Sequence, residues 1–163
     1  MAASDAAIPN SIIDITSIVI SDAGANSKTL ALGKGGITWS VELAPAVEVK
    51  HQNLRTSPPT ERKTGVGMVK GHLKAAVTSL FGSADETLYE VMTRTGTAAA
   101  WANTCTGDTG RGRIVVTYAT PSGMSQTATF AYIRFAEPSI AYDEDILYVE
   151  ADFTDLEAAP TIA

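Results

Sequence analysis

The chain has few of the residues on which covalent or metal chemistry depends. Among its 163 residues there is one cysteine, Cys105, and there are two histidines, His51 and His72. A single cysteine excludes an intrachain disulfide, so the composition does not indicate a disulfide-rich secreted scaffold. Cysteine and histidine nowhere occur at a spacing that resembles a zinc site.

Long apolar runs are also missing. No segment approaches the ~20 apolar residues that span a bilayer as a helix. The first ten residues, MAASDAAIPN, have neither the cationic region nor the apolar region of a secretory signal. We therefore expect a protein that is made in a cytoplasm and has no membrane partner. The length and the hydrophobic content of 45% predict a single domain over residues 1–163, with extended termini at 1–10 and 158–163.

Positive charge is absent from the C-terminal part of the chain. Residues 135–163 contain eight Asp/Glu and no Lys or Arg, whereas residues 1–134 contain all 12 Lys/Arg and ten Asp/Glu. The net charge of −6 argues against general nucleic-acid binding. Two explanations of the acidic region stay open: it increases solubility, or it receives a basic partner.

The sequence offers no set of residues that suits catalysis. His51 lies in a basic segment, His72 lies between two lysines on a polar strand face, and Cys105 lies in a Thr- and Gly-rich loop without a nearby histidine. GKGG, residues 33–36, precedes a strand pattern and does not open a helix, which favours a turn over a phosphate site. Three adjacent acids, residues 143–145, cannot all reach one ion from an extended chain, so a solvated turn is favoured. We predict that the protein is not an enzyme and has no cofactor and no metal site.

Two segments alternate with period two and predict long, half-buried strands. They are residues 35–50, GGITWSVELAPAVEVK, where Pro45 interrupts the pattern as at a bulge or an edge, and residues 65–81. The apolar set of the first segment is Ile37, Trp39, Val41 and Leu43; that of the second is Val69, Leu73, Ala75 and Val77, opposite Lys70, His72 and Lys74.

A helical pattern follows the second strand. Ser83 and Glu86 have the spacing of a capping box, which predicts a helix that begins at residue 83 and ends at Gly96. Its buried stripe would consist of Leu88, Val91 and Met92.

The remaining segments predict more strands. Residues 11–21 indicate a strand, 113–135 a hairpin with its turn at PSGM, and 146–153 a terminal strand. In the terminal strand Glu150 and Asp152 alternate with apolar residues and are expected to face outward. The closing EAAPTIA is expected to stay unpacked. The predicted fold class is mainly β, an antiparallel β-sandwich or partial barrel with one flanking α-helix.

A long basic segment separates the first two alternating strands. Residues 50–65, KHQNLRTSPPTERKTG, contain four Lys/Arg, one Glu and almost nothing that could enter a core. Most connections in compact domains are shorter, so we expect residues 50–64 to form a weakly structured arm between adjacent strands. A solvent-exposed loop without a partner is the alternative.

The order of strand, basic arm, long strand, capped helix, hairpin, terminal strand and acidic tail resembles the tail tube (major tail) proteins of tailed bacteriophages. The resemblance rests on GGITWSVELAPAVEVK, the arm 50–64, GVGMVKGHLKAAVTSL, the helix after Ser83 and the closing ILYVEADFTDLEAA. It covers residues 35–157 and is one of pattern and order, without a fixed motif.

The resemblance implies a structural virion protein of the phage tail. Tail tube proteins are β-sandwiches or partial barrels, and six copies close into a ring whose sheets join into a barrel around a lumen. Stacked rings form the conduit for DNA ejection. The implied partners are further copies of the chain, other tail proteins or a sheath, and DNA that passes without specific binding. The arm would reach the next ring and become ordered there, with the acidic tail as a receiving surface. Its expected inter-ring contacts are Lys50, Arg55, Arg62 and Lys63.

A conduit should not hold the DNA that passes through it. Each Lys or Arg that neutralises a phosphate adds affinity by releasing counterions, so we expect a net negative wall. Glu150 and Asp152 are the first candidates to face the lumen, and Glu42 is the second. The basic face of residues 70–74 opposes this expectation unless nearby acids pair with the lysines.

Two other functions stay open. One is another β-rich virion protein, such as a capsid decoration protein or a tail adaptor, whose arm would bind the capsid lattice. The other is a module that binds carbohydrate or peptide on an aromatic platform, for which Trp39 and Trp101 are the candidates. Trp39 belongs to an alternating apolar set and is expected in the core.

Overall fold

The computed structural model is mainly β, as the sequence predicts, and its described residues contain one short α-helix and one 3₁₀ helix. It describes residues 14–42, 46–49, 60–63, 68–81, 85–105, 111–119, 123–155 and 160–163. Its elements are β1 (Asp14–Ser21), β2 (Ser27–Thr29), β3 (Ala31–Glu42), β4 (Ala46–Val49), β5 (Thr60–Lys63), β6 (Met68–Val77), α1 (Leu88–Thr93), η2 (Gly96–Ala100), β7 (Gly112–Ala119), β8 (Ser125–Phe135), β9 (Ser139–Asp143), β10 (Ile146–Asp155) and β11 (Thr161–Ile162).

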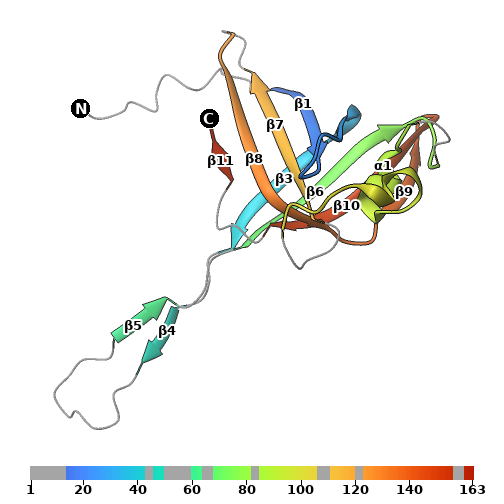
Figure 1. Cartoon of the computed structure of the whole chain (residues 1–163). Helices are drawn as coiled ribbons and strands as arrows, with labels where there is room; N and C mark the ends of the chain where they lie inside the picture. The colour runs from blue at the N-terminus through green and yellow to red at the C-terminus, as the bar shows by residue number, and fades with distance from the viewer. Residues whose placement is uncertain are drawn as a thin grey trace.

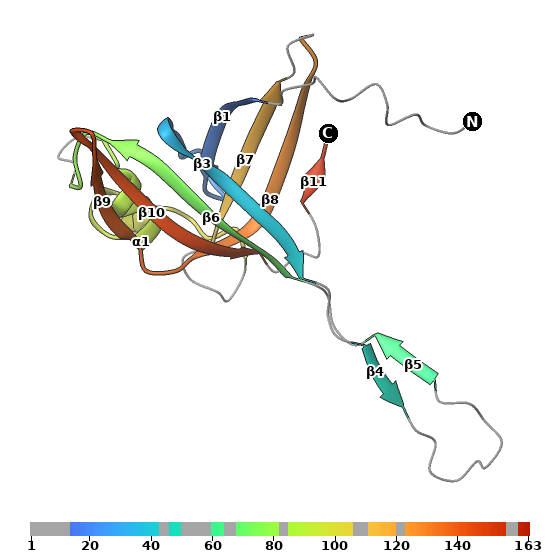
Figure 2. The ribbon, with the colours of Figure 1, turned by 180° about the vertical axis from the view of Figure 1, so that it is seen from behind.

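Nine of these strands form one antiparallel sheet. Its order is β2-β1-β7-β8-β10-β6-β3, and two strands lie off this path because β11 pairs with β8 and β9 pairs with β10. The hairpin predicted over residues 113–135 is confirmed as β7 and β8. β4 and β5 pair with each other in a separate sheet, and Figures 1 and 2 show this hairpin apart from the large sheet.

The large sheet folds back on itself where β8 meets β10. These strands pair at one end, where residues 133–135 lie opposite residues 153–155. Beyond this junction β8 continues with β7 and β1 in one layer, and β10 continues with β6 and β3 in the other (Figure 1). The Phe130 ring meets the rings of Trp39 and Phe153 edge to face, with centroids 5.6 and 5.7 Å apart. The layers thus enclose an apolar core and form an open sandwich.

The predicted alternation of β6 and β10 places the core between the two layers. Gly71 of β6 has a specific part in it, because a Cβ at this position would lie 2.3 Å from the Phe153 ring and 2.4 Å from the Thr38 carbonyl oxygen. The missing side chain lets the Phe153 ring lie across β6. Each large apolar side chain that is fully buried here contributes about 1.5–3 kcal/mol. Buried residues from the predicted inward faces include Val69, Leu73, Ala75, Val149, Ala151 and Phe153.

The helix begins later than the sequence predicts. α1 starts after the N-cap Thr87, whose hydroxyl accepts a hydrogen bond from Glu90 N at 3.3 Å, while Glu90 Oε2 accepts one from Thr87 N at 3.1 Å. Glu86 precedes the helix and is not its N3 residue, and Ser83 lies outside the described residues. The capping box of Thr87 and Glu90 forms in place of the predicted one because the buried Glu90 carboxylate also accepts a hydrogen bond from Thr97 in η2. The predicted buried stripe is confirmed at Leu88, Val91 and Met92.

The last residues pair with the sheet, contrary to the prediction of an unpacked tail, and residues 161–163 stay exposed in this pairing. Pro160 is buried, β11 pairs with β8, and Ala163 and Thr127 exchange two backbone hydrogen bonds of 2.8 and 3.0 Å. The edge of β8 supplies this pairing, and a two-residue strand has too little pattern of its own to reveal it. The extended terminus predicted for residues 1–10 lies outside the described residues.

Asp22 ties the β1–β2 turn to the segment after η2. Its carboxylate accepts hydrogen bonds from the backbone N–H groups of Gly24, Asn26 and Ala102 at 2.8, 3.1 and 2.9 Å, and from the Asn26 side chain at 2.7 Å. Burial alone would raise the pKa of Asp22, but these hydrogen bonds, that from Ala102 foremost, outweigh burial and lower it. A carboxylate with a lowered pKa stabilises the folded state wherever it is ionised in both states.

We expect Asp22→Asn to lower the free energy of unfolding at neutral pH by roughly 1–3 kcal/mol. The asparagine NH₂ group would replace one carboxylate oxygen and would face N–H groups that need an acceptor. The difference in free energy of unfolding between the wild type and the variant is fully present above the pKa of Asp22 in the unfolded chain, about 4. It is lost as the pH falls through the lower pKa of Asp22 in the folded protein. Urea denaturation of both proteins, near neutral pH and in strong acid, measures this difference under each condition. A difference between the two proteins that persists undiminished in strong acid would contradict this account.

Candidate functional site

The outer face of the β3-β6-β10 layer carries charged residues from all three of its strands. The antiparallel register aligns them in rows across the three strands, and the predicted conduit acids Glu42, Glu150 and Asp152 share this face with the basic residues of β6. The rows are Ser40–Lys70–Thr154, Thr38–His72–Asp152 and Gly36–Lys74–Glu150, with Glu42 opposite Met68 at one end.

Acids and bases on this face lie within ion-pair distance. Lys70 Nζ lies 2.9 Å from Glu42 Oε2. His72 lies between two carboxylates, with Nδ1 2.9 Å from Asp152 Oδ1 and Nε2 3.5 Å from Glu150 Oε2. All five side chains are partly exposed. The prediction of a non-basic wall required acids near the lysines of β6. The structure places such acids on the same surface.

Lys74 makes a cation–π contact with Tyr148. Its ammonium group lies 4.7 Å from the centre of the Tyr148 ring. Tyr148 is fully buried because a bulge of β3 folds over it, and there Lys34 N donates a hydrogen bond to Tyr148 Oη at 3.2 Å. Gly33 permits this bulge, since it has a φ of 54° and a Cβ there would lie 3.0 Å from Tyr148 Oη.

The same layer has an open edge on each side. β3 pairs with β6 along one edge, and β9 pairs with β10; no described strand pairs with the other edge of either. Apolar side chains are exposed at both edges, namely Trp39 and Val41 on β3, and Ile140 and Tyr142 on β9. Unpaired strand edges with exposed apolar side chains are surfaces on which a further chain can pair.

The sequence reasoning missed β9. The turn predicted at residues 143–145 is present, and Glu144 and Asp145 adopt φ values of 46° and 64°, as a two-residue mirror-image hairpin turn requires. A tight turn next to a strong terminal strand requires a partner strand before it. The alternation of Ile140 and Tyr142 was the available signal.

The predicted arm is described in part. β5 pairs in register with β4, so residues 60–63 of the predicted arm form a strand where a weakly structured segment was expected. Arg62 and Lys63 lie in β5, whereas Lys50, Arg55 and residues 43–45 lie outside the described residues. The strand predicted over residues 35–50 is therefore divided between β3, in the large sheet, and β4, in the hairpin.

The two tryptophans differ in their surroundings. Trp101 is buried, with the Arg94 guanidinium 5.5 Å from its ring centre. Trp39 is 37% exposed, contrary to the expectation of a core position, because β3 is an edge strand at the mouth of the sandwich. Its ring packs against Phe130 and its Nε1 donates a hydrogen bond to Tyr118 Oη at 3.3 Å. These contacts hold Trp39 in the sandwich mouth.

In the described part of the chain, no group of three or more His, Cys, Asp or Glu side chains is placed to hold a metal ion. None of the described helices is long and apolar enough to cross a membrane. No protein-family model matches the sequence, and a search of curated proteins found no match.

We expect the exposed ion pairs of the outer face to add little to stability, because water and salt screen them. In a double-mutant cycle of Lys70→Ala and Glu42→Ala, the coupling energy from urea denaturation should be below about 1 kcal/mol. The buried pair Thr87 and Glu90, tested with Thr87→Ala and Glu90→Ala, should give a larger coupling. A coupling of several kcal/mol at the outer face would mean that these charges serve folding.

Proposed function

We propose that the protein is a structural component of a phage tail, and that its copies form stacked rings around a lumen through which DNA passes. The observation that carries the proposal is the four-stranded layer β3-β6-β10-β9, which has an open edge on both sides. It is supported by the hairpin β4–β5, which stands apart from the large sheet at the end of this layer where β3 ends and β6 begins (Figure 2).

Strand direction supports closure into a ring. β3 and β10 run toward the end of the layer that bears the hairpin, and β6 and β9 run away from it. When copies stand side by side with their hairpins pointing the same way, β9 of one copy is antiparallel to β3 of the next. The joined strands continue the alternation of the layer, and backbone hydrogen bonds can form across each junction.

The two edges differ, and so the contact between copies is heterologous. A heterologous contact makes rings when its rotation closes. β9 covers the half of β10 remote from the hairpin, whereas the exposed Trp39 and Val41 lie on the half of β3 that is near it. Pairing between these edges is thus staggered along the strands, and a closed barrel requires such a stagger.

The outer face of the layer suits the wall of a conduit. Between β3 and β10 it presents three carboxylates, two ammonium groups and one imidazole. Lys70 lies beside Glu42 and Lys74 lies over Tyr148, so neither lysine stands alone on the surface. A polyanion meets a surface of mixed sign with no cationic stripe, which limits the release of counterions and the affinity that comes from it.

We expect Val41→Lys to prevent assembly without unfolding the subunit, because a charge on an open strand edge opposes pairing with another chain. Negative-stain electron microscopy of the purified wild-type protein should show hollow filaments of constant width. The variant should yield monomers with an unchanged urea midpoint. Met124→Lys, at an exposed apolar residue near the β7–β8 turn, is the matched control and should still assemble.

Filaments of normal width from Val41→Lys would exclude the β3 edge as the ring contact. Wild-type protein that forms neither rings nor filaments at high concentration would count against the whole proposal, and would favour a decoration or adaptor protein.

We expect Glu150→Lys combined with Asp152→Lys to produce filaments that retain double-stranded DNA, because the wall becomes net positive. Co-sedimentation should detect DNA with these filaments at low salt and lose it steeply as salt rises. Wild-type filaments should retain little DNA. The control Asp14→Lys with Met124→Lys and Ser125→Lys makes the same total charge change on exposed residues at β1 and at the start of β8, in the other layer. Equal DNA retention by the test variant and this control would show that the outer face of the β3-β6-β10 layer does not line the lumen.

A further inference from the structure

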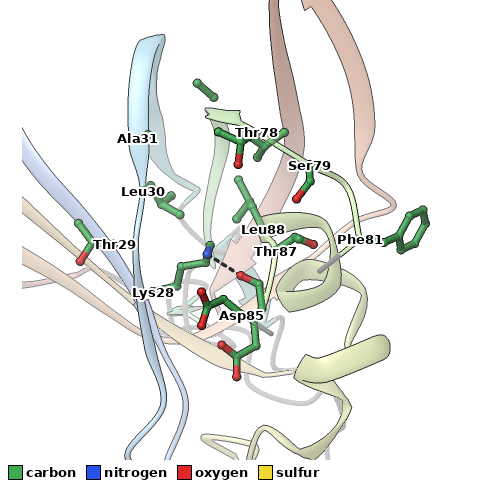
Figure 3. Close-up of a pocket in the computed structure, with 13 residues that line it drawn as sticks. Lys28, Thr29, Leu30, Ala31, Thr78, Ser79, Phe81, Asp85, Thr87 and Leu88 are labelled. Carbon is green, nitrogen blue, oxygen red and sulfur yellow. Dashed lines mark hydrogen bonds between the residues drawn. The ribbon is translucent and has the colours of Figure 1, made fainter. Parts of the chain in front are cut away.

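A cavity of about 470 Å³ opens at the end of the β3-β6-β10 layer that is opposite the hairpin. It lies between the β2–β3 connection, the end of β6 and the segment that enters α1 (Figure 3). Its walls combine apolar residues such as Leu30 and Leu88 with hydroxyl groups and the acids Asp85 and Glu86. We call it the distal cavity. Its volume lies in the range of cavities that bind ligand-sized groups.

The position of the distal cavity is fixed by the strands that form the layer. β6 begins at Met68, at the end of the layer from which the hairpin projects, and reaches the cavity at Ala76 and Val77, after nine steps of about 3.3 Å each. Figures 1 and 2 agree in placing the hairpin at one end of the layer, and α1 with the β9–β10 turn at the other. The described length of β6, about 30 Å, therefore lies between the hairpin end of the layer and the distal cavity.

The distal end is acidic. Besides Asp85 and Glu86 it carries the exposed β9–β10 turn, Asp143–Asp145. Two lysines lie nearby, but both already have oxygen partners. Lys28 Nζ donates a hydrogen bond to the Glu86 carbonyl oxygen at 2.5 Å, the dashed line in Figure 3, and Lys34 Nζ lies 2.5 Å from Glu144 Oε2. Carboxylate charge thus remains in excess at this end.

The opposite end of the molecule has the complementary charge. Residues 46–63, which run from the start of β4 to the end of β5, contain four Lys/Arg and two Asp/Glu. Arg62 and Lys63 lie at the C-terminal end of β5, opposite the first residues of β4, and therefore at the base of the hairpin. A copy displaced along the strand direction therefore turns its hairpin end toward the acidic distal end of the copy beyond it.

We infer that the distal cavity and the acidic β9–β10 turn receive the β4–β5 hairpin of a second copy of this chain in the next ring. The inference rests on the proposed stacking of rings and adds the receiving surface. Of the acidic tail expected from the sequence to receive the arm, this surface contains only the turn Asp143–Asp145, because the late acids are dispersed and Asp155 is buried at the hairpin end of β10. Each copy then presents one donor and one acceptor surface, so the contact does not close on itself and builds an open, polar filament.

Charge reversal on each surface, and then on both together, tests the inference. The distal variant is Asp85→Lys with Asp143→Lys, and the hairpin variant is Arg62→Glu with Lys63→Glu. Each alone should raise the critical concentration for filament growth by about tenfold or more, because two charge pairs per contact become repulsive. The chain with all four substitutions should recover growth, since opposite charges face each other again. Sedimentation measures the critical concentration, and electron microscopy identifies rings that do not stack.

The matched control is Asp14→Lys with Glu137→Lys, which changes the charge equally at exposed residues away from the distal end and should grow as the wild type does. Urea midpoints verify that each variant folds. If the lysine substitutions unfold the chain, Asp85→Asn with Asp143→Asn should raise the critical concentration in the same direction by a smaller factor.

The outcomes separate the two proposals. Wild-type filaments together with unimpaired growth of the distal variant would overturn the distal cavity as the receiving surface and leave the ring proposal in place. Failure of the fourfold variant to recover, with folding intact, would likewise overturn the pairing of these two surfaces. Wild-type protein that forms no rings at all would overturn the proposed function and this inference with it.

Discussion

The pairing of β10 on both sides is the constraint on which the structure depends. β10 pairs with β6 over nine residue pairs, and its opposite edge is divided between β9 and β8. The sheet therefore splits at the middle of β10. One half of the edge turns into the second layer through β8, and the other half continues in the same layer as β9. The core, the charged outer face and the two open edges follow from this division, because it fixes which strands share a layer and which face one another.

The division explains how far the sequence could predict the fold. Strands that are buried on one face, such as β6 and β10, show strict alternation, so their position and their inner faces could be read directly. β9 and β11 are five and two residues long. They exist because a sheet edge receives them, and their own sequences hold too little periodicity to reveal that edge. The start of α1 was ambiguous for a local reason, because Ser83–Glu86 and Thr87–Glu90 have the same capping spacing and only burial of Glu90 distinguishes them.

The outer face of the β3-β6-β10 layer, which is the candidate site, could likewise be predicted from the sequence only in part. Its residue types and their outward direction could be predicted, since alternation separates Lys70, His72 and Lys74 from the core. Their partners could not, because an ion pair between strands depends on register, and a shift of one residue moves every side chain to the other face. The register in the structure sets His72 beside Asp152 and Lys74 beside Glu150, and the bulge of β3 buries Tyr148 beneath Lys74. A face that appeared basic in one strand is of mixed sign across three.

An even number of antiparallel strands has a consequence for assembly. A layer of four such strands begins and ends with strands of opposite direction, so identical layers joined edge to edge keep the antiparallel pattern only if all copies point the same way. In the proposed ring every β4–β5 hairpin therefore projects from one side and every acidic distal end faces the other. The polarity of a stack of rings would then arise from the parity of the layer, while the charge of the two ends would decide how firmly one ring holds the next. Stability of the subunit and strength of stacking would thus depend on different residues, the first on the buried core around Phe130 and Phe153, the second on exposed charges that contribute little to folding.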